Sequence, residues 1–322
     1  MVASPHYVEN VIATFDRAAD ANRQMPGRHG STVVLAPELA DEVMITGDVH
    51  GHRRNFHRIQ QIASLDEHPR RHLVLQEVCH GGPSYPGGGC MSHTILDDVA
   101  ELVARHPRQV HLILGNHELA ELSDFPICKN NQLLNMSFRL GLRQRYGSAE
   151  EEIRLALTRF LWSCPLAVRL PQGSCERMGT GSEPTHADLV KTASGEAPVP
   201  IFSQPQGILV THSLPERVDL QGFDPSVLLR DLRADDGVDG RDVFRLVWGR
   251  DYRRTNAQAF SELAGARLLI TGHEPCFEGF AVPNDLQVIL DCCGDKGAYV
   301  ILPVGVELSQ AEIVERIEML EE

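Results

Sequence analysis

The chain has 322 residues, of which 42% are hydrophobic and 23% charged, and its net charge at pH 7 is −14. This composition is ordinary for a soluble globular protein, and the negative charge argues against a general nucleic-acid binder or a protein attracted to anionic lipid. The N-terminus lacks the pattern of a signal peptide, and no apolar run approaches the roughly 20 residues that span a bilayer. The eight cysteines show no CxxC spacing. We therefore expect a cytoplasmic protein with reduced thiols and with neither a nucleic-acid nor a membrane partner.

The apolar pattern predicts alternating helices and strands. Amphipathic spacing predicts helices, and short apolar runs bounded by glycine and polar residues predict buried strands. In chain order these elements are a helix at 7–20, strands at 43–46 and 73–75, a helix at 94–105, a strand at 110–114, a helix at 150–162, a strand at 208–211, a helix at 256–264, strands at 268–271 and 288–290, and a helix at 309–320. The alternation is typical of an α/β protein with a layered sheet.

One long segment departs from this alternation. Residues 171–206 are rich in Gly, Ser, Pro and Thr, and strand-like runs resume on both sides. We interpret the segment as a surface insertion within a single domain that covers residues 1–322. A plain loop is the simpler interpretation, and a substrate lid is the alternative. The domain would begin with a helical extension at 1–30 and end with a C-terminal helix at 305–322.

Five of the predicted strands end in side chains that can bind a metal ion. They are Asp48 and His50 in MITGDVHG, Glu77 in LVLQE, Asn116 and His117 in LILGNHE, His212 in ILVTH, and His273 in LLITGH. Any one of these residues has an ordinary structural explanation, because a single buried histidine is more often part of the core. Five in the same context are hard to explain in that way, since the carboxyl ends of strands in open α/β sheets converge on a ligand-binding crevice.

The residue types at these strand ends indicate the kind of metal. None of them is cysteine, which excludes a Cys-rich structural zinc site, whereas carboxylate, imidazole and amide oxygen suit Mn²⁺, Fe, Zn²⁺ or Ni²⁺. A central carboxylate can bridge two ions about 3.5–4 Å apart, and such a pair polarises a phosphoryl oxygen and activates a water molecule. Asp291, just past the strand at 288–290, is a further possible ligand, although an N-cap or surface role is the more ordinary one.

These motifs resemble those of the calcineurin-like metallophosphoesterases, and within them the small bacterial and phage members of the phosphoprotein phosphatase family. GDVHG, GNHE, LVTHS and TGHEP carry the resemblance, which runs from about residue 43 to about residue 301 apart from the insertion. Residues 248–275 are similar in order and spacing to the phage-type enzymes. The resemblance implies a layered αββα sandwich with mixed sheets and a centre of two divalent ions, with Mn²⁺ as the first expectation.

The resemblance also implies a role for each residue of these motifs. Asp48 and His50 would bind the first metal, and Glu77 stands where the family has its bridging Asp. Asn116, His212 and His273 would hold the second metal, with Asn116 also at the substrate. His117 would be the general acid that protonates the leaving oxygen, and Arg250 would bind a phosphate oxygen.

The second motif departs from the family. The family pattern is Gly-Asp-x-x-Asp-Arg-Gly, and residues 76–82 read QEVCHGG. Glu77 keeps the carboxylate, while His80 replaces the Asp that orients the catalytic His, so we expect His80 to share in catalysis with His117. Gly81 replaces a phosphate-binding Arg. Arg53 or Arg54, just after GDVHG, is a candidate to bind substrate in place of that Arg, a solvated surface arginine being the ordinary alternative. Replacing Gly81 with Arg would test the effect of the lost arginine.

We expect from these features a metal-dependent phosphoric monoester hydrolase of the protein-phosphatase type. Its substrate would be a phosphoprotein or a small phosphorylated molecule. Without the second Arg, a phosphodiesterase or a dinucleoside polyphosphate hydrolase is the alternative, because those phosphates carry less negative charge. A non-catalytic metal-containing binding protein is the lesser alternative.

Overall fold

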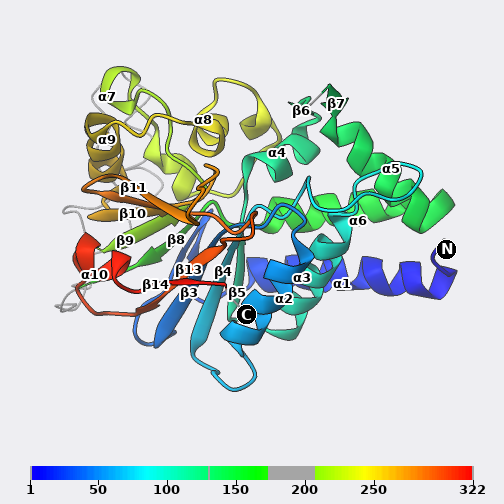
Figure 1. The fold of residues 1–322 in the computed structure, drawn as a ribbon, viewed down its shortest axis with the longest axis horizontal. Coiled ribbons are helices and arrows are strands. Elements are labelled where there is room, and N and C mark those ends of the chain that lie inside the picture. The colour runs from blue at the N-terminus through cyan, green and yellow to red at the C-terminus, as the bar shows by residue number, and fades with distance from the viewer. Residues whose placement is uncertain (1, 130, 173–206, 321–322) are drawn as a thin grey trace.

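The computed structural model describes residues 2–129, 131–172 and 207–320, in which two β-sheets lie between layers of helices (Figure 1). One sheet has five strands in the order β14 (Ile317–Met319), β13 (Ala298–Pro303), β3 (Glu42–Asp48), β4 (Arg71–Gln76) and β5 (Val110–Ile113). Strands β3, β4 and β5 are parallel, whereas β13 is antiparallel to both of its neighbours. This sheet is therefore mixed.

The second large sheet is also mixed and has seven strands. Their order is β1 (Arg28–His29), β2 (Thr32–Val34), β8 (Ala167–Leu170), β9 (Ile208–Thr211), β10 (Leu268–Thr271), β12 (Gln287–Leu290) and β11 (Phe280–Asn284). Strands β9, β10 and β12 run parallel to one another. A small hairpin of β6 (Cys128–Lys129) and β7 (Gln132–Leu133) lies apart from both sheets.

Alternation of side chains along the strands separates two hydrophobic cores. In β3, Val43 and Ile45 belong to the core between the sheets, where they join Val210 and Ile270 of the other sheet. Met44, between them in sequence, belongs instead to the core that the helices cover. Successive residues of a strand point to opposite faces, so both faces of this sheet are buried. The predicted layered αββα sandwich with mixed sheets is confirmed.

The helices surround the two sheets, and most of them cover the outer faces (Figure 1). They are α1 (Pro5–Arg23), α2 (Arg53–Ala63), α3 (His93–Arg105), α4 (Asn116–Ser123), α5 (Leu134–Tyr146), α6 (Glu150–Ser163), α7 (Val218–Gln221), α8 (Asp242–Trp248), α9 (Arg254–Ala264) and α10 (Gln310–Val314). Helix α1 begins where Ser4 accepts a hydrogen bond from the Tyr7 backbone N–H, with a proline in the first turn. None of the helices in the described part of the chain is both long and apolar enough to cross a membrane.

The predicted elements are largely present, with one correction near the C-terminus. All six predicted strands and the helices at 7–20, 94–105, 150–162 and 256–264 are found. The helix expected at 309–320, within the C-terminal helix at 305–322, is wrong after residue 314, because 317–319 form strand β14 on the edge of the five-stranded sheet. Pairing with β13 outweighs the local helical spacing there. The expected insertion at 171–206 lies outside the described residues except for 171 and 172.

The N-terminal helix is part of the main core. Phe15 is fully buried and its ring lies 5.8 Å from the ring of Phe160 on α6, and Val8, Val11 and Ala18 belong to the same cluster. Helix α1 packs against both α3 and α6. The first helix therefore covers the layer that supports the five-stranded sheet.

We predict that Phe15→Ala lowers the free energy of unfolding by about 3–5 kcal/mol, because it leaves a cavity in this core. Chemical denaturation measures the effect, with Arg17→Ala on the exposed side of α1 as the control. Equal stability of the two variants would show that α1 is not part of the cooperative core.

Candidate metal centre

The predicted ligand residues gather where the two sheets meet. Strands β3, β4 and β5 end on one side of the site, and β9 and β10 end on the other. A parallel bridge between Asp48, at the end of β3, and Asp291, just after β12, joins the two sheets at this point. The carboxyl ends of five parallel strands thereby face one another across a short distance, as expected for a ligand site in such sheets.

The loops at these strand ends are held in an uncommon backbone conformation. Of the eight non-glycine residues with positive φ in the described chain, four belong to this site: His50 (42°), Glu77 (28°), His80 (55°) and His273 (70°). Left-handed backbone is costly for residues with a Cβ and persists only where the surroundings enforce it. Four such residues in one site indicate that the surrounding structure holds their side chains in place despite the cost in backbone energy.

Asp48, His50 and Glu77 form the first group of potential metal ligands, with one ligand atom from each within 4.8 Å of the others. His50 Nε2 lies 3.8 Å from Asp48 Oδ2 and 3.5 Å from Glu77 Oε2. His50 Nδ1 lies 3.1 Å from the carbonyl oxygen of Cys79 and 3.0 Å from that of His80. Since a carbonyl only accepts, Nδ1 carries the hydrogen and Nε2 is left to bind a metal.

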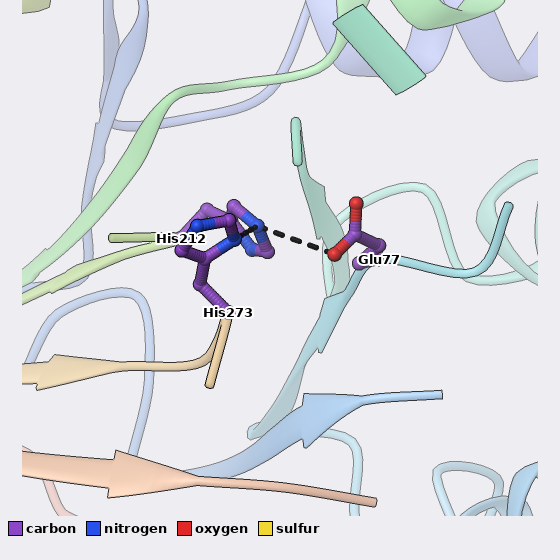
Figure 2. Close-up of side chains that lie close together, drawn as sticks. All are labelled: Glu77, His212 and His273. Atoms are coloured by element: carbon purple, nitrogen blue, oxygen red, sulfur yellow. Dashed lines mark hydrogen bonds and ion pairs between the residues drawn. The ribbon is translucent and has the colours of Figure 1, made fainter. Parts of the chain in front are cut away.

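Glu77, His212 and His273 form the second group. Figure 2 shows the Glu77 carboxylate, from the end of β4, facing the two imidazoles from the other sheet. His212 Nε2 lies 3.3 Å from Glu77 Oε2 and 3.1 Å from His273 Nδ1. Asn116 completes this group, with its side-chain oxygen 2.9 Å from His212 Nε2. Glu77 is the residue that the two groups share.

The hydrogen bonding within the second group is that of a cation site. The Asn116 side-chain oxygen faces only acceptor atoms, including the Glu77 carboxylate and His273 Nδ1. The imidazole nitrogens on this side are His212 Nε2 and His273 Nδ1, which lie 3.1 Å apart. Lone pairs that converge in a buried space are satisfied by a positive charge. Together with the oxygen and nitrogen donor set, this arrangement fits divalent metal ions.

The protonation of the metal-free centre follows from its burial and its charges. Burial, together with the charge of Glu77, raises the pKa of Asp48 to about 7. Burial opposes the ionised form of Glu77, but the imidazoles of His117, His212 and His50 outweigh it and hold its pKa well below the usual range. Burial also disfavours the charged form of His212, whereas Glu77 and Asp48 raise its pKa to about 9. Metal binding must therefore displace a proton from His212.

Further contacts fix the ligands in place. The Glu118 carboxylate accepts from the backbone N–H groups of Val78 (2.9 Å) and Cys79 (2.8 Å), which holds the loop after Glu77. The Asp48 carboxylate accepts from the His273 N–H at 3.0 Å. A Cβ on Gly272 would lie 2.2 Å from Asp48 Oδ1, so the backbone can approach this carboxylate only at a glycine.

The two predicted catalytic histidines lie beside the ligand groups. His117 Nδ1 lies 3.2 Å from His80 Nδ1, and the His117 backbone N–H donates to Glu77 Oε1 at 2.7 Å. Burial and the neighbouring imidazoles of His50 and His80 lower the pKa of His117 to about 3, against the opposite effect of Glu77. The metal-free protein thus holds a neutral His117 imidazole at neutral pH.

The two arginines predicted to bind substrate are both engaged by carboxylates. Arg250 is paired with Glu274, which also accepts from the Tyr252 hydroxyl at 2.8 Å. Arg53 Nη1 lies 2.6 Å from Asp98 Oδ2 on α3. Binding of substrate by Arg250 or Arg53 stays a prediction.

Asp291 is not a surface residue, which corrects one expectation. It is buried, and its carboxylate accepts from the backbone N–H groups of Cys276 and Cys293, each at 2.8 Å. It therefore shapes the two loops that follow β10 and β12. Neither of the two ligand groups includes it.

Gly81 cannot simply be exchanged for arginine. Its φ is +123°, and a Cβ at this position would lie 2.4 Å from the carbonyl oxygen of His50. An arginine would displace the loop that carries His50, a potential metal ligand. The substitution therefore fails as a test of a missing phosphate contact, because it would damage the centre itself.

Three carboxylates near the site were not assigned a role from the sequence. Glu118 lies within the GNHE motif, Glu121 follows His117 at a spacing of four on helix α4, and Glu274 follows His273 directly. The helical spacing of Glu121 and His117 is a signal that places both side chains on one helix face. The partners of Glu274 come from another loop and left no such signal.

Comparison with known structures agrees with the fold. A protein serine/threonine phosphatase from Saccharomyces cerevisiae, with similarity to human phosphatase PP5, has a similar structure with a TM-score of 0.62 and 14% identity, over 98% of this chain and 90% of that chain. A point mutant of a cold-active protein tyrosine phosphatase aligns with a TM-score of 0.51 and 11% identity, over 94% of this chain and 84% of that chain. Among curated protein sequences, none matches significantly. At these identities the structural likeness shows a shared fold.

The fold and the ligand groups define a metal-dependent hydrolase that acts on phosphoric esters. The sequence model of the calcineurin-like phosphoesterase family matches residues 42–277, which is well over half of the chain. The chain belongs to the calcineurin-like phosphoesterase family. The match includes strands of both sheets and every residue of the two potential ligand groups.

We predict that Glu77→Gln weakens metal binding at both positions, because its carboxylate is common to the two groups. His273→Ala removes a ligand from the second group alone and should leave about one ion per chain where the unaltered protein holds about two. Elemental analysis after dialysis against Mn²⁺ measures the stoichiometry.

The control for this prediction is Glu42→Gln, since Glu42 begins strand β3 at the end of the sheet far from the site and pairs with Arg71. It should keep the full metal content. A Glu77→Gln protein that loses only one of two ions would contradict a shared ligand.

Proposed function

We propose that this protein is a di-metal-dependent phosphoric monoester hydrolase of the protein-phosphatase type. The observation that carries the proposal is the buried Glu77 carboxylate, shared between two ligand groups and also bonded to the backbone of His117. Its substrate would be a phosphoprotein or a small phosphorylated molecule in the cytoplasm. Mn²⁺ is the first candidate for both ions, with Fe, Zn²⁺ or Ni²⁺ as alternatives.

The ligand residues would divide between the two ions as the two groups suggest. Asp48 and His50 would hold one ion, and Asn116, His212 and His273 the other, with Glu77 between them. Two ions held in this way would supply Lewis acidity at the phosphoryl oxygens and would activate a water molecule as the nucleophile. Arg250, once released from Glu274, would bind an equatorial phosphate oxygen.

His117 would donate a proton to the leaving oxygen as the P–O bond breaks. Because burial and the neighbouring imidazoles lower the pKa of His117 to about 3 in the metal-free protein, His117 would take up this proton together with the substrate. The negative charge of a bound phosphate ester favours the imidazolium form. An alkoxide leaving group depends on this proton far more than a p-nitrophenolate does, since the latter is stable as an anion near neutral pH.

A second candidate function is the hydrolysis of phosphodiesters or dinucleoside polyphosphates. Two observations favour it over a monoesterase: glycine stands at position 81, and the remaining arginine is paired with Glu274. Both reduce the positive charge available to a dianionic phosphate. A phosphodiester carries one negative charge and so needs less of it.

Turnover of p-nitrophenyl phosphate and of its bis-ester, with Mn²⁺ supplied, tests the proposal. We expect hydrolysis of the monoester that Asp48→Asn abolishes, because Asp48 is a ligand of the first group. A faster rate on the bis-ester would replace the monoesterase by the second candidate. Absence of turnover on both, in protein that retains two ions, would mean a non-catalytic metal-containing binding protein.

We further predict that Glu274→Gln raises kcat/KM for the monoester roughly tenfold and changes the diester rate less. The substitution removes the charge that holds Arg250, and a charge-assisted hydrogen bond to substrate contributes about 1.5–3 kcal/mol. The ratio of the two rates is the measured quantity.

Glu278→Gln is the matched control, because Glu278 lies in the same loop but pairs with Lys296 at 2.6 Å. The ratio of monoester to diester hydrolysis in this variant should equal that of the unaltered protein. A Glu274→Gln protein with an unchanged ratio would show that Glu274 does not restrain Arg250.

A further inference from the structure

His80 links the predicted general acid to a buried carboxylate on helix α4. His80 Nδ1 lies 3.2 Å from His117 Nδ1, and its other ring nitrogen, Nε2, lies 2.8 Å from Glu121 Oε1. The exposed fractions of the His80 and Glu121 side chains are 1% and 4%. The three side chains therefore form a chain of hydrogen bonds that is closed to solvent at the Glu121 end.

A backbone N–H group determines which atoms donate and which accept in this series of hydrogen bonds. The backbone N–H of Ile127 donates to Asn135 Oδ1 at 2.9 Å, which fixes the orientation of the Asn135 amide. Asn135 Nδ2 must then be the donor to Glu121 Oε1, at 3.0 Å. Glu121 Oε1 is thus an acceptor, and the hydrogen between it and His80 belongs to His80 Nε2.

This assignment extends to His117. A neutral imidazole with its hydrogen on Nε2 has a lone pair on Nδ1. We assign His80 this form, in which its Nδ1 accepts a hydrogen bond from His117 Nδ1–H. The remaining nitrogen of His117, Nε2, makes no hydrogen bond within the described chain and is the one left for the substrate.

The His80 backbone is constrained as firmly as its ring. Its N–H donates to Ser92 Oγ at 2.9 Å, and its carbonyl oxygen accepts from His50 Nδ1 at 3.0 Å. The ring also packs edge-on against Phe138, with ring centres 5.6 Å apart. These contacts hold the imidazole between His117 and Glu121.

We propose that Glu121 is a positioning residue that acts through His80 to orient His117. In the family, the Asp of the second motif contacts the catalytic His directly. Here the carboxylate of Glu121 reaches His117 through the intervening His80. This inference rests on the proposed function of His117 as the proton donor. In the step itself the P–O bond breaks, its electron pair stays on the leaving oxygen, and that oxygen takes the proton from His117 Nε2 while Nδ1–H remains bonded to His80.

The first test is independent of turnover. In metal-free protein, ¹⁵N NMR of the histidine side chains should show His80 as the Nε2–H tautomer and His117 as the Nδ1–H tautomer. A His80 that carries its hydrogen on Nδ1 would overturn the chain of hydrogen bonds, whatever the protein hydrolyses.

The second test uses two esters with different leaving groups. Glu121→Gln keeps an acceptor but removes the charge, and Glu121→Ala removes both. We expect kcat for O-phosphoserine to fall about tenfold in the first variant and about a hundredfold in the second, because a positioned acid contributes about 10²–10⁴-fold. Hydrolysis of p-nitrophenyl phosphate, which needs little acid, should change less than about threefold.

A double substitution separates positioning from a general structural effect. In a His117→Asn background, Glu121→Gln should have no further effect on phosphoserine, since residues that act through one another are not additive. Asp97→Asn is the matched control: this largely buried carboxylate on α3 accepts from the Tyr146 hydroxyl. It should leave both esters unchanged, and metal content and melting temperature verify that each variant is folded.

The outcomes are distinct. Equal loss on the two esters, or a further loss in the His117→Asn background, would refute the positioning role. If the unaltered protein hydrolyses neither ester, the proposed function fails, and the NMR tautomers still decide whether the three residues form the chain.

Discussion

The position of the Glu77 carboxylate is the constraint on which the rest of the site depends. It comes from the five-stranded sheet, yet His212 and His273, which it faces, come from the seven-stranded one. A carboxylate shared in this way requires the carboxyl ends of β4, β9 and β10 to converge within a few ångströms. The packed core between the sheets, built from residues such as Val74 and Ile270, fixes that convergence, because close-packed interiors deform little.

Holding the buried carboxylates and imidazoles of the site together without a metal is energetically unfavourable. Contacts around the site offset part of this cost. Asp48 and Glu77 are nearly fully buried, and four residues of the site adopt left-handed backbone. Backbone N–H groups directed at Asp48 and Glu77, and the hold of Glu118 on the following loop, compensate part of the charge and the strain. Such preorganisation favours a bound cation over the empty centre, since the ion then finds its ligands already placed.

Much of this site could be predicted from the sequence because its ligands follow strands directly. Asp48, Asn116, His212 and His273 each stand at or just after a short buried apolar run, so a local pattern placed them at the same edge. Asp291 and the segment at 317–319 were misjudged, since their environments come from pairing with chain far away in sequence. The pairing of Arg250 with Glu274 and the bond between His80 and Glu121 likewise depend on tertiary geometry that no local spacing records.

The unusual second motif is best understood as one coupled rearrangement rather than three separate losses. Gly81 packs against the His50 carbonyl so closely that no side chain fits there. Beside it, His80 reaches from the same loop to Glu121, and its carbonyl orients His50. A shorter Asp at position 80 would leave the buried Glu121 carboxylate without its hydrogen bond from His80, at a cost of about 1–3 kcal/mol for the unpaired group. The residues at positions 80, 81 and 121 are therefore mutually dependent, and exchanging His80 or Gly81 alone for its family counterpart would disturb the other two.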